Sequence, residues 1–424
     1  MRELSIIGGR PLEGEVRIQG AKNSVLPILA ASLLTDEVCE IRNCPNLTDV
    51  QTALSILENL GCRVSYDGKT ARIQAANVCG FVIPDELMRR MRSSVMFLGA
   101  ILSRCGRACI SYPGGCELGA RPIDIHLRAL MRLGTVIQED GGYIRCSLEG
   151  VKPQTITLMF PSVGATENIL LLCAVSEGET ILVNPAREPE IVDLQNFLNC
   201  MGADIVGAGT DSIRIRGVSR LHGCTYGVIP DRIAASTYAC GAVACGGEIL
   251  LTGAEPMHLR MLLSVLRDMG ARIAEDEAGL WIRMKRRPLA VPSVKTLPYP
   301  GFPTDAQAPL MAALLTAEGS SVVSETIFEN RFKHVGEFLR MGADVQLEGL
   351  NAIVRGVPRL HGAEVNAADL RCGAALVIAG LCAEGNTTVR QIEYIERGYE
   401  DIAGAFCRLG GRVKVVERPE ENDR

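Results

Sequence analysis

An apolar helix end, a glycine and then a β-branched segment follow one another at six places along the 424 residues of the chain. The glycines of the six copies are Gly61, Gly134, Gly202, Gly270, Gly342 and Gly410. Successive glycines lie 73, 68, 68, 72 and 68 residues apart. Glycine readily adopts the left-handed conformation that closes a helix C-terminus before an extended segment. The pattern therefore predicts six helices that each end at a glycine and lead into a strand.

A second kind of helix lies between these glycines, and it is apolar nearly all round. It is rich in Ala, Leu and Cys and runs through a polar turn with glycine into a β-branched strand, as in residues 168–181 and 373–389. A helix without a polar face is predicted to be buried. One repeat is thus about 70 residues of alternating strands and helices. We predict an α/β protein of six similar units.

Six such units are too large for one hydrophobic core, because domains usually hold about 100–200 residues. Three units in each of two domains is the simplest grouping. Residues 218–230 interrupt the pattern between the third and fourth units. We predict a domain boundary in this segment.

The composition, 47% hydrophobic and 22% charged, is typical of a globular protein. The chain has 44 Lys and Arg against 49 Asp and Glu, a net charge of −5, which argues against a general binder of nucleic acid or acidic membranes. Its longest apolar stretches, such as residues 25–34 and 374–383, are shorter than the ~20 residues that span a bilayer. The N-terminus lacks the apolar region of a secretory signal, so we expect a cytoplasmic protein.

Sixteen cysteines raise the question of disulfides or a metal site. The chain has no C-x-x-C pair, and none of its five histidines, His126 included, has the spacing of a metal ligand. We expect no metal and interpret nearly all the cysteines as small, reduced core residues. Those placed inside apolar runs are Cys173, Cys200, Cys240, Cys382 and Cys407.

The predicted starts of the buried helices carry unusual charge. Counting back 14 or 15 residues from the glycine that follows each helix gives Arg92, Gly164, Arg232, Asp305 and Arg371, and Lys22 holds the same place in the first unit. The free N–H groups and the macrodipole of a helix start favour anions and disfavour cations. Either these side chains are solvated or pair with nearby carboxylates, or together they form a binding site for a multiply charged anion such as phosphate.

Asp305 breaks this cationic series. Its carboxylate is either an N-cap or a general base for a substrate hydroxyl. The dipole and the arginines should both lower its pKa, which keeps the group ionised but limits its strength as a base.

The segment 111–126 departs from the repeat. Cys116 lies there in a glycine-rich loop near Arg121, a setting that lowers the pKa of a thiol and makes it reactive. The alternative is a turn cysteine without a role. The three glycines of this segment up to Arg121 suggest a lid.

Ten motifs, in order along essentially the whole chain, resemble those of the UDP-N-acetylglucosamine 1-carboxyvinyltransferases, a family of enolpyruvyl transferases. They are GAKN at 20–23, MRSS at 91–94, PGGC at 113–116 with GARP at 119–122, SVGAT at 162–166, AREPEIVD at 186–193, PDR at 230–232, FPTD at 302–305, FENRF at 328–332, DLR at 369–371 and ERGYE at 396–400. The resemblance implies a two-domain inside-out α/β barrel with three units per domain and the active site in the cleft between the domains. It places residues 22–229, with the Cys116 loop, in one domain, and residues 1–21 plus 230–424 in the other.

The resemblance also implies a reaction without metal or organic cofactor, at the start of peptidoglycan precursor synthesis. The 3-hydroxyl of UDP-N-acetylglucosamine adds to C2 of phosphoenolpyruvate, and the tetrahedral intermediate expels phosphate. Lys22, Arg121 and Arg397 are implied to hold phosphoenolpyruvate, with Asn23 and Arg92 nearby. Cys116 is implied to protonate C3 and to be alkylated by fosfomycin, and Asp305 to take the hydroxyl proton. The implied sugar-nucleotide site is Arg121, Pro122, Ile123, Asp124, Ile125, Ser162, Val163, Gly164 and the backbone at Ile327. Further residues expected to line the substrate site are Arg232, Arg331, Asp369 and Arg371.

One departure and two alternatives accompany this interpretation. Residues 159–161 read Met-Phe-Pro where some relatives have a lysine, so a diphosphate contact from that side chain is absent. A shikimate-pathway enolpyruvyl transferase shares the fold and the mechanism but lacks the Cys116 loop. A catalytically silent scaffold would have lost reactive residues, whereas this chain retains those expected to act, namely Lys22, Cys116, Asp305, Arg371 and Arg397.

Overall fold

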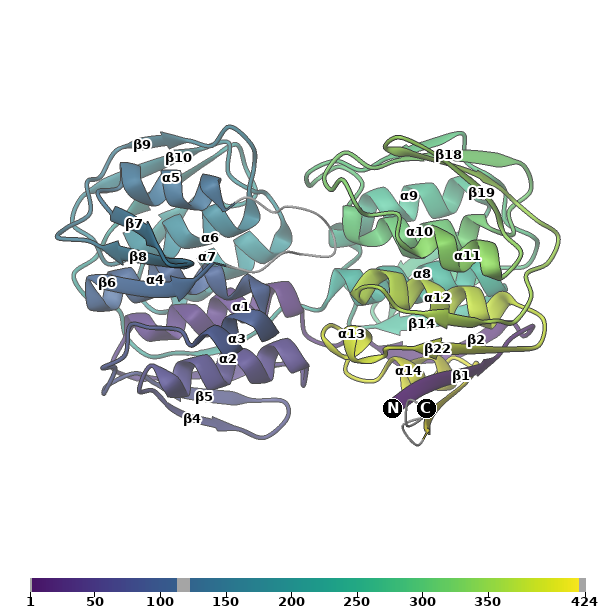
Figure 1. Cartoon of the computed structure of the whole chain (residues 1–424), viewed down its shortest axis with the longest axis horizontal. Helices are drawn as coiled ribbons and strands as arrows, with labels where there is room; N and C mark the ends of the chain where they lie inside the picture. The colour runs from purple at the N-terminus through teal and green to yellow at the C-terminus, as the bar shows by residue number, and fades with distance from the viewer. Residues whose placement is uncertain (1, 113–122, 419–424) are drawn as a thin grey trace. The chain divides into compact units, whose positions relative to one another are not determined.

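The structure is a computed structural model that describes residues 2–112 and 123–418. These residues form two compact units, each with a hydrophobic core of its own. The C-unit comprises residues 2–19 and 230–418, and the N-unit comprises residues 20–112 and 123–229. Figure 1 shows both units as layers of helices and sheets.

Each repeat contributes one sheet, and the strand after the repeat glycine pairs with its successor in an antiparallel hairpin in five of the six sheets. In the sixth sheet, β23 (Arg412–Glu417) pairs instead with the N-terminal strand β1 (Arg2–Ile7), which also pairs with β22 (Asn386–Arg390). Strand β2 (Leu12–Arg17) lies parallel to β14 (Gly247–Thr252). The start of the chain therefore completes two sheets of the C-unit.

The other C-unit strands are β15 (Arg272–Asp276), β16 (Gly279–Met284), β17 (Ser293–Lys295), β18 (Ser320–Ser324), β19 (Asp344–Glu348), β20 (Asn351–Arg355) and β21 (Glu364–Asn366). The N-unit strands are β3 (Val38–Arg42), β4 (Arg63–Tyr66), β5 (Ala71–Gln74), β6 (Arg107–Ser111), β7 (Val136–Asp140), β8 (Tyr143–Ser147), β9 (Thr155–Thr157), β10 (Glu179–Val183), β11 (Asp204–Val206), β12 (Ser212–Arg216) and β13 (Thr225–Gly227).

Three helices form the interior of each unit, as the apolar pattern predicts. They are α8 (Arg232–Cys245), α10 (Gln307–Leu314) and α12 (Leu370–Cys382) in the C-unit, and α1 (Lys22–Ala31), α4 (Phe97–Cys105) and α6 (Val163–Cys173) in the N-unit. In the C-unit the three pack against one another, and each also packs on a sheet outside it. In the N-unit α4 packs on both α1 and α6. Helices inside and sheets outside are the inside-out arrangement that the resemblance implies.

The outer helices are amphipathic and precede the six repeat glycines. They are α2 (Thr48–Asn59), α5 (Asp124–Arg132), α7 (Pro189–Cys200), α9 (Arg260–Asp268), α11 (His334–Arg340) and α14 (Ile402–Arg408). Each glycine lies two residues after its helix and has a positive φ, from 80° at Gly410 to 103° at Gly134. The predicted helix ends are therefore confirmed. Shorter elements are η1 (Ser32–Leu34), α3 (Asp85–Arg90), η2 (Arg92–Met96), η3 (Pro256–Leu259), η4 (Thr304–Ala306) and α13 (Glu393–Glu396).

The interpretation of the cysteines is correct for the inner helices and wrong for the outer ones. Cys173 and Cys240 are buried and Cys382 is half-buried, but Cys200 and Cys407 are exposed. The two exposed residues lie on α7 and α14, whose outward faces meet solvent. An apolar run in an amphipathic helix does not determine the face on which a small cysteine lies.

Gly99 lets the inner helices α4 and α6 approach closely. A Cβ atom at this position would lie 2.3 Å from the backbone oxygen of Asn168. The Asn168 side chain accepts a hydrogen bond from the Gly99 N–H at 2.6 Å and donates to the carbonyl oxygens of Val95 and Gly164. Close packing and a buried amide thus join the two helices.

Replacing Gly99 by alanine should destabilise the N-unit by about 1–3 kcal/mol, because the two helices must move apart and the hydrogen bonds of the Asn168 side chain must lengthen. The matched control is Gly336→Ala in α11, where an added Cβ has nothing within 4 Å. That change should be neutral or stabilising, by up to about 1 kcal/mol. Thermal melting of both variants checks the prediction, and equal melting temperatures would contradict it.

Candidate active site

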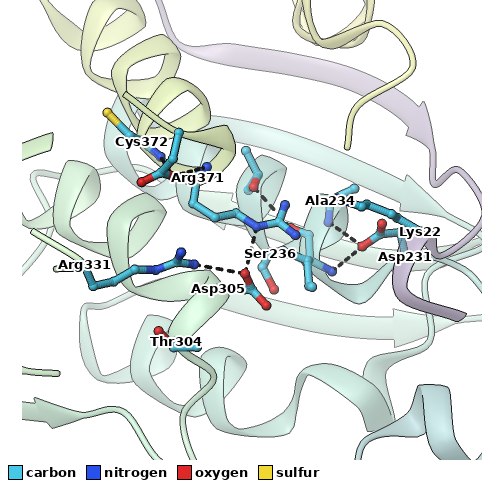
Figure 2. A network of polar contacts seen from close by, with 12 residues as sticks. Lys22, Asp231, Ala234, Ser236, Thr304, Asp305, Arg331, Arg371 and Cys372 are labelled. Atoms are coloured by element: carbon cyan, nitrogen blue, oxygen red, sulfur yellow. Dashed lines mark hydrogen bonds and ion pairs between the residues drawn. The ribbon is translucent and has the colours of Figure 1, made fainter. Parts of the chain in front are cut away.

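Asp305 lies in η4, at the start of the inner helix α10, between two buried arginines. Its Oδ1 atom is 3.0 Å from Nη2 of Arg331 and 3.0 Å from Nε of Arg371. Figure 2 shows both guanidinium groups directed at this carboxylate. The side chains of the arginines are 3% and 6% exposed, while that of Asp305 is 28% exposed. The carboxylate is thus fixed from inside the unit and still reachable from solvent.

The electrostatics keep Asp305 ionised. Burial by itself raises the pKa of the carboxyl group, but the charges of Arg371, Arg331 and, more weakly, Arg232 outweigh burial and hold the pKa well below its usual range. No side-chain cap bond is present in η4, whose N-cap residue is Pro303. Of the two interpretations of Asp305, the simple N-cap is therefore wrong, and the group is a strongly paired hydrogen-bond acceptor.

Arg371 is held against the dipole of its own helix by polar partners. Its Nη1 atom donates to the hydroxyl of Tyr399 at 3.3 Å, and that hydroxyl is hydrogen-bonded to Oγ1 of Thr237 in α8 at 2.7 Å. Burial lowers the pKa of Arg371, but Asp305, Tyr399 and Asp231 together raise it by more, so the guanidinium stays charged. Tyr399 was not expected at the site, although it belongs to the 396–400 motif.

The carboxylates of Asp231 and Asp369 cap inner helices. Asp231 accepts from the N–H groups of Ile233 and Ala234 at the start of α8. Asp369 accepts from the N–H groups of Arg371 and Cys372 at the start of α12. The positive end of each helix dipole disfavours the buried arginine at the same helix start. The negative charge of the capping carboxylate offsets this unfavourable interaction. The substrate contact expected of Asp369 stays a prediction.

The remaining C-unit candidates lie on elements next to Asp305 or Arg371. Arg232 is the first residue of α8 and stacks over the ring of Tyr299 at 5.6 Å. Ile327 follows β18, in the loop that ends at Arg331. Arg397 is the C-cap residue of α13, two residues before Tyr399.

Lys22 and Asp49 form a buried ion pair in the N-unit. Lys22 is the first residue of α1, and its Nζ atom lies 2.5 Å from Oδ2 of Asp49 in the first turn of α2. Asp49 is 1% exposed and Lys22 is 9% exposed. Asn23 follows Lys22 in α1, and Arg92 begins η2 before α4. Asp49 was missed because an acidic residue in a first helical turn usually indicates only a favourable dipole contact.

The starts of α5 and α6 bring the predicted sugar-nucleotide residues together. Ile123 is the N-cap residue of α5, which begins with Asp124 and Ile125, and Ser162 caps α6, which begins with Val163 and Gly164. A Cβ on Gly164 would lie 2.5 Å from Nε2 of His126, so the two helix starts are in contact through this imidazole. Burial lowers the pKa of His126 to about 4, so the ring is neutral. The sequence has no metal-ligand spacing at His126 and did not predict its contact with Gly164. Cys116, Arg121 and Pro122 lie outside the described residues.

Glu167 is a buried carboxyl group in α6. Burial, and then the charges of Glu190 and Glu188, raise the pKa of Glu167 to about 8. Between the pKa of about 4.3 in an unfolded chain and 8, the folded N-unit keeps a proton that the unfolded chain loses. The free energy of unfolding therefore falls as the pH rises through this window.

Replacing Glu167 by glutamine should remove this loss. The free energy of unfolding of the variant, relative to that of the wild type, should be about 3 kcal/mol higher at pH 8 than at pH 5. Urea denaturation at the two pH values measures the difference. The control is Glu179→Gln, a carboxylate that is 41% exposed on β10. A Glu167→Gln effect that is the same at both pH values would contradict the prediction.

Asp305 lies among the buried cations Arg232, Arg331 and Arg371, with the helix-capping carboxylate of Asp231 close enough to act on Arg371. Such a cluster suits an anionic substrate, with Asp305 as an acceptor for a hydroxyl. Within residues 2–112 and 123–418, no group of three or more His, Cys, Asp or Glu side chains could hold a metal ion. Nor does any helix in that part of the chain have the length and apolarity to cross a membrane.

Comparison with known proteins identifies the family. The family model for EPSP synthase (3-phosphoshikimate 1-carboxyvinyltransferase) matches residues 6–406. UDP-N-acetylglucosamine 1-carboxyvinyltransferase 2 of Caldanaerobacter subterraneus subsp. tengcongensis is 50% identical over 97% of this chain and 99% of that protein. UDP-N-acetylglucosamine 1-carboxyvinyltransferase 1 of Carboxydothermus hydrogenoformans is 47% identical over 99% of this chain and 100% of that protein. The chain belongs to the UDP-N-acetylglucosamine 1-carboxyvinyltransferase family.

Solved structures agree with this membership. The enolpyruvyl transferase NikO from Streptomyces tendae has a TM-score of 0.88 at 27% identity over 99% of both chains. An EPSP synthase from Acinetobacter baumannii has a TM-score of 0.76 at 19% identity, over 98% of this chain and 100% of that one, and shares the fold alone. The UDP-N-acetylglucosamine 1-carboxyvinyltransferase family is therefore a branch of a wider group with one fold, and this transferase has the expected inside-out architecture.

Proposed function

We propose that the chain transfers the enolpyruvyl group of phosphoenolpyruvate to the 3-hydroxyl of UDP-N-acetylglucosamine and releases phosphate. The hydroxyl oxygen bonds to C2 while C3 gains a proton. The tetrahedral intermediate then loses phosphate from C2 and a proton from C3, which restores the double bond. No metal or organic cofactor is required. The product is an enolpyruvyl ether, and the reaction is the first committed step of peptidoglycan precursor synthesis. It takes place in the cytoplasm and supports cell-wall growth, cell shape and cell division.

The observation that carries the proposal is the ionised Asp305 among buried arginines. A carboxylate that stays deprotonated can accept the 3-hydroxyl proton, but its low pKa makes it a weak base. Proton transfer must therefore accompany C–O bond formation rather than precede it. Arg331 and Arg371 fix the carboxylate, so no reorganisation is needed at the moment of reaction.

The other roles follow from the family. Lys22, Arg121 and Arg397 bind phosphoenolpyruvate, and the starts of α5 and α6 bind the sugar nucleotide. The contact between Gly164 and His126 supports the second assignment, because it places two helix N-termini and their free N–H groups side by side. The stretch 159–161 has no lysine where some relatives have one, so affinity for the diphosphate must come from elsewhere.

Phosphate release from phosphoenolpyruvate tests the proposal. Release that requires UDP-N-acetylglucosamine is the expected result. Release with shikimate 3-phosphate alone would assign the chain to the sister reaction of the shikimate pathway. No release with either acceptor, from a folded sample, would favour a catalytically silent scaffold.

Cys116 is the proposed acid for C3 and the reactive thiol. Fosfomycin, an epoxide, should alkylate the wild-type protein and inactivate it, whereas Cys116→Ser should remain unlabelled because a hydroxyl is a far weaker nucleophile than a thiolate. Intact-protein mass spectrometry measures the label. Cys200→Ser, which removes an exposed cysteine, is the control and should be labelled like the wild type. Labelling of Cys116→Ser would contradict the assignment.

A further inference from the structure

Glu325 is a carboxyl group in the interior of the C-unit. It follows β18 directly and is 0% exposed. Its Oε1 atom accepts hydrogen bonds from Oγ1 of Thr296 at 2.9 Å and from the N–H groups of Ile327 and Phe328 at 2.8 and 3.2 Å. Its Oε2 atom accepts from Oγ1 of Thr304 at 2.9 Å. A buried carboxyl group is tolerated only when its acceptor sites are used, and four donors use them here.

Three of these four donors, all but Thr296, belong to the two segments that hold Asp305. Thr304 directly precedes Asp305 in η4, and Figure 2 shows the two side by side. Ile327 and Phe328 lie in the loop from Glu325 to Arg331, and Arg331 pairs with Asp305 at 3.0 Å. The loop 325–331 is therefore attached to the Asp305 turn at both ends, by the Glu325 carboxyl group at one end and the Arg331 guanidinium at the other.

Glu325 has no cationic partner among the residues that the structure describes, unlike Asp305. Its contacts are directional hydrogen bonds from hydroxyl and backbone groups, which determine position more than net charge. A shift of Glu325 moves the Thr304 side chain and the Ile327 backbone together. The first change displaces the Asp305 carboxylate, and the second displaces the backbone at which the family resemblance places a sugar-nucleotide contact.

We propose that Glu325 is a positioning residue for enolpyruvyl transfer, because one buried carboxyl group aligns the Asp305 turn with the loop at Ile327. The inference rests on the proposed function of the site. Glu325 touches neither substrate, and acts through Thr304 and the Ile327 backbone. A residue that only stabilised the fold would change the melting temperature and leave the kinetic constants of the remaining folded enzyme unchanged.

The experiment removes single hydrogen bonds rather than the whole carboxyl group. Thr304→Val deletes the bond between Glu325 and the Asp305 turn and leaves the other three. We expect kcat to fall about 10- to 100-fold at saturating substrates, because small displacements of a reacting group have effects of this size. Thr304→Ser keeps the hydroxyl and should recover most of the rate. Glu325→Gln supplies an amide donor where an acceptor is needed, and should raise KM for UDP-N-acetylglucosamine as well as lower kcat.

The matched control is Ser321→Ala in β18. Ser321 is 1% exposed, and its hydroxyl accepts from the N–H of Val291 without reaching the Asp305 turn. This variant should lose stability and keep its kcat. The inference is overturned if Thr304→Val has wild-type constants, or if Thr304→Val and Ser321→Ala lower kcat alike. A wild-type enzyme that releases no phosphate with UDP-N-acetylglucosamine overturns the proposed function and this inference together, whereas an active wild type with unaffected variants overturns only the positioning role.

Discussion

Asp305→Asn should lower kcat about 10²- to 10⁴-fold with both substrates saturating, the range expected when a general base is removed. Asparagine is close to aspartate in size but cannot accept the hydroxyl proton. It also leaves Arg331 and Arg371, 3% and 6% exposed, without their shared anion. We therefore expect the free energy of unfolding of the C-unit to fall by about 3 kcal/mol as well. Steady-state kinetics and urea denaturation separate the two effects.

The control for this change is Asp344→Asn in β19. Asp344 pairs with Arg355 at 3.2 Å, but both side chains are about half exposed, at 51% and 48%. An exposed pair contributes only about 0–1 kcal/mol. This variant should therefore match the wild type in both measurements. A kcat of Asp305→Asn within a few-fold of wild type would show that the carboxylate does not take the proton.

Lys22→Gln should lower kcat/KM for phosphoenolpyruvate about 10²- to 10³-fold, the effect of removing one fixed electrostatic partner of a developing charge. The loss arises because the ammonium group lies at the start of α1, where it adds to the N-terminal dipole in attracting an anion. Asp49→Asn keeps the ammonium group but removes the carboxylate 2.5 Å away. It should have a smaller effect, about tenfold, mainly on KM, because Lys22 loses its fixed position.

Initial-rate kinetics with phosphoenolpyruvate as the varied substrate measure both variants. Lys69→Gln, a change at an exposed lysine in the same unit, controls for the loss of a positive charge. If Lys22→Gln and Lys69→Gln had the same kcat/KM, the assignment of Lys22 would be wrong. If Asp49→Asn exceeded Lys22→Gln in its effect, the carboxylate would have a role of its own in the reaction.

The sequence predicted the elements of the fold correctly because their signals are local. Each repeat glycine has a positive φ and marks the end of the helix before it. Gly61, for example, lies two residues after Asn59, the last residue of α2. The absence of a polar face predicted that α12 is buried, and counting back from Gly385 placed Arg371 at its start. Each signal lies within a single helix and the residues that directly flank it.

The sequence by itself therefore determined the six α/β units, the buried helices and the cations at their starts, and by resemblance the family. Only the tertiary structure decided the partners of those charges. Asp305 meets Arg331 and Arg371 across 26 and 66 residues of sequence. Asp49, Glu325 and the exposed face of Cys407 were likewise invisible in the sequence. Helical and strand periodicities identify which face of an element is apolar, but a buried charge is stabilised by a single partner, whose place depends on how distant elements pack.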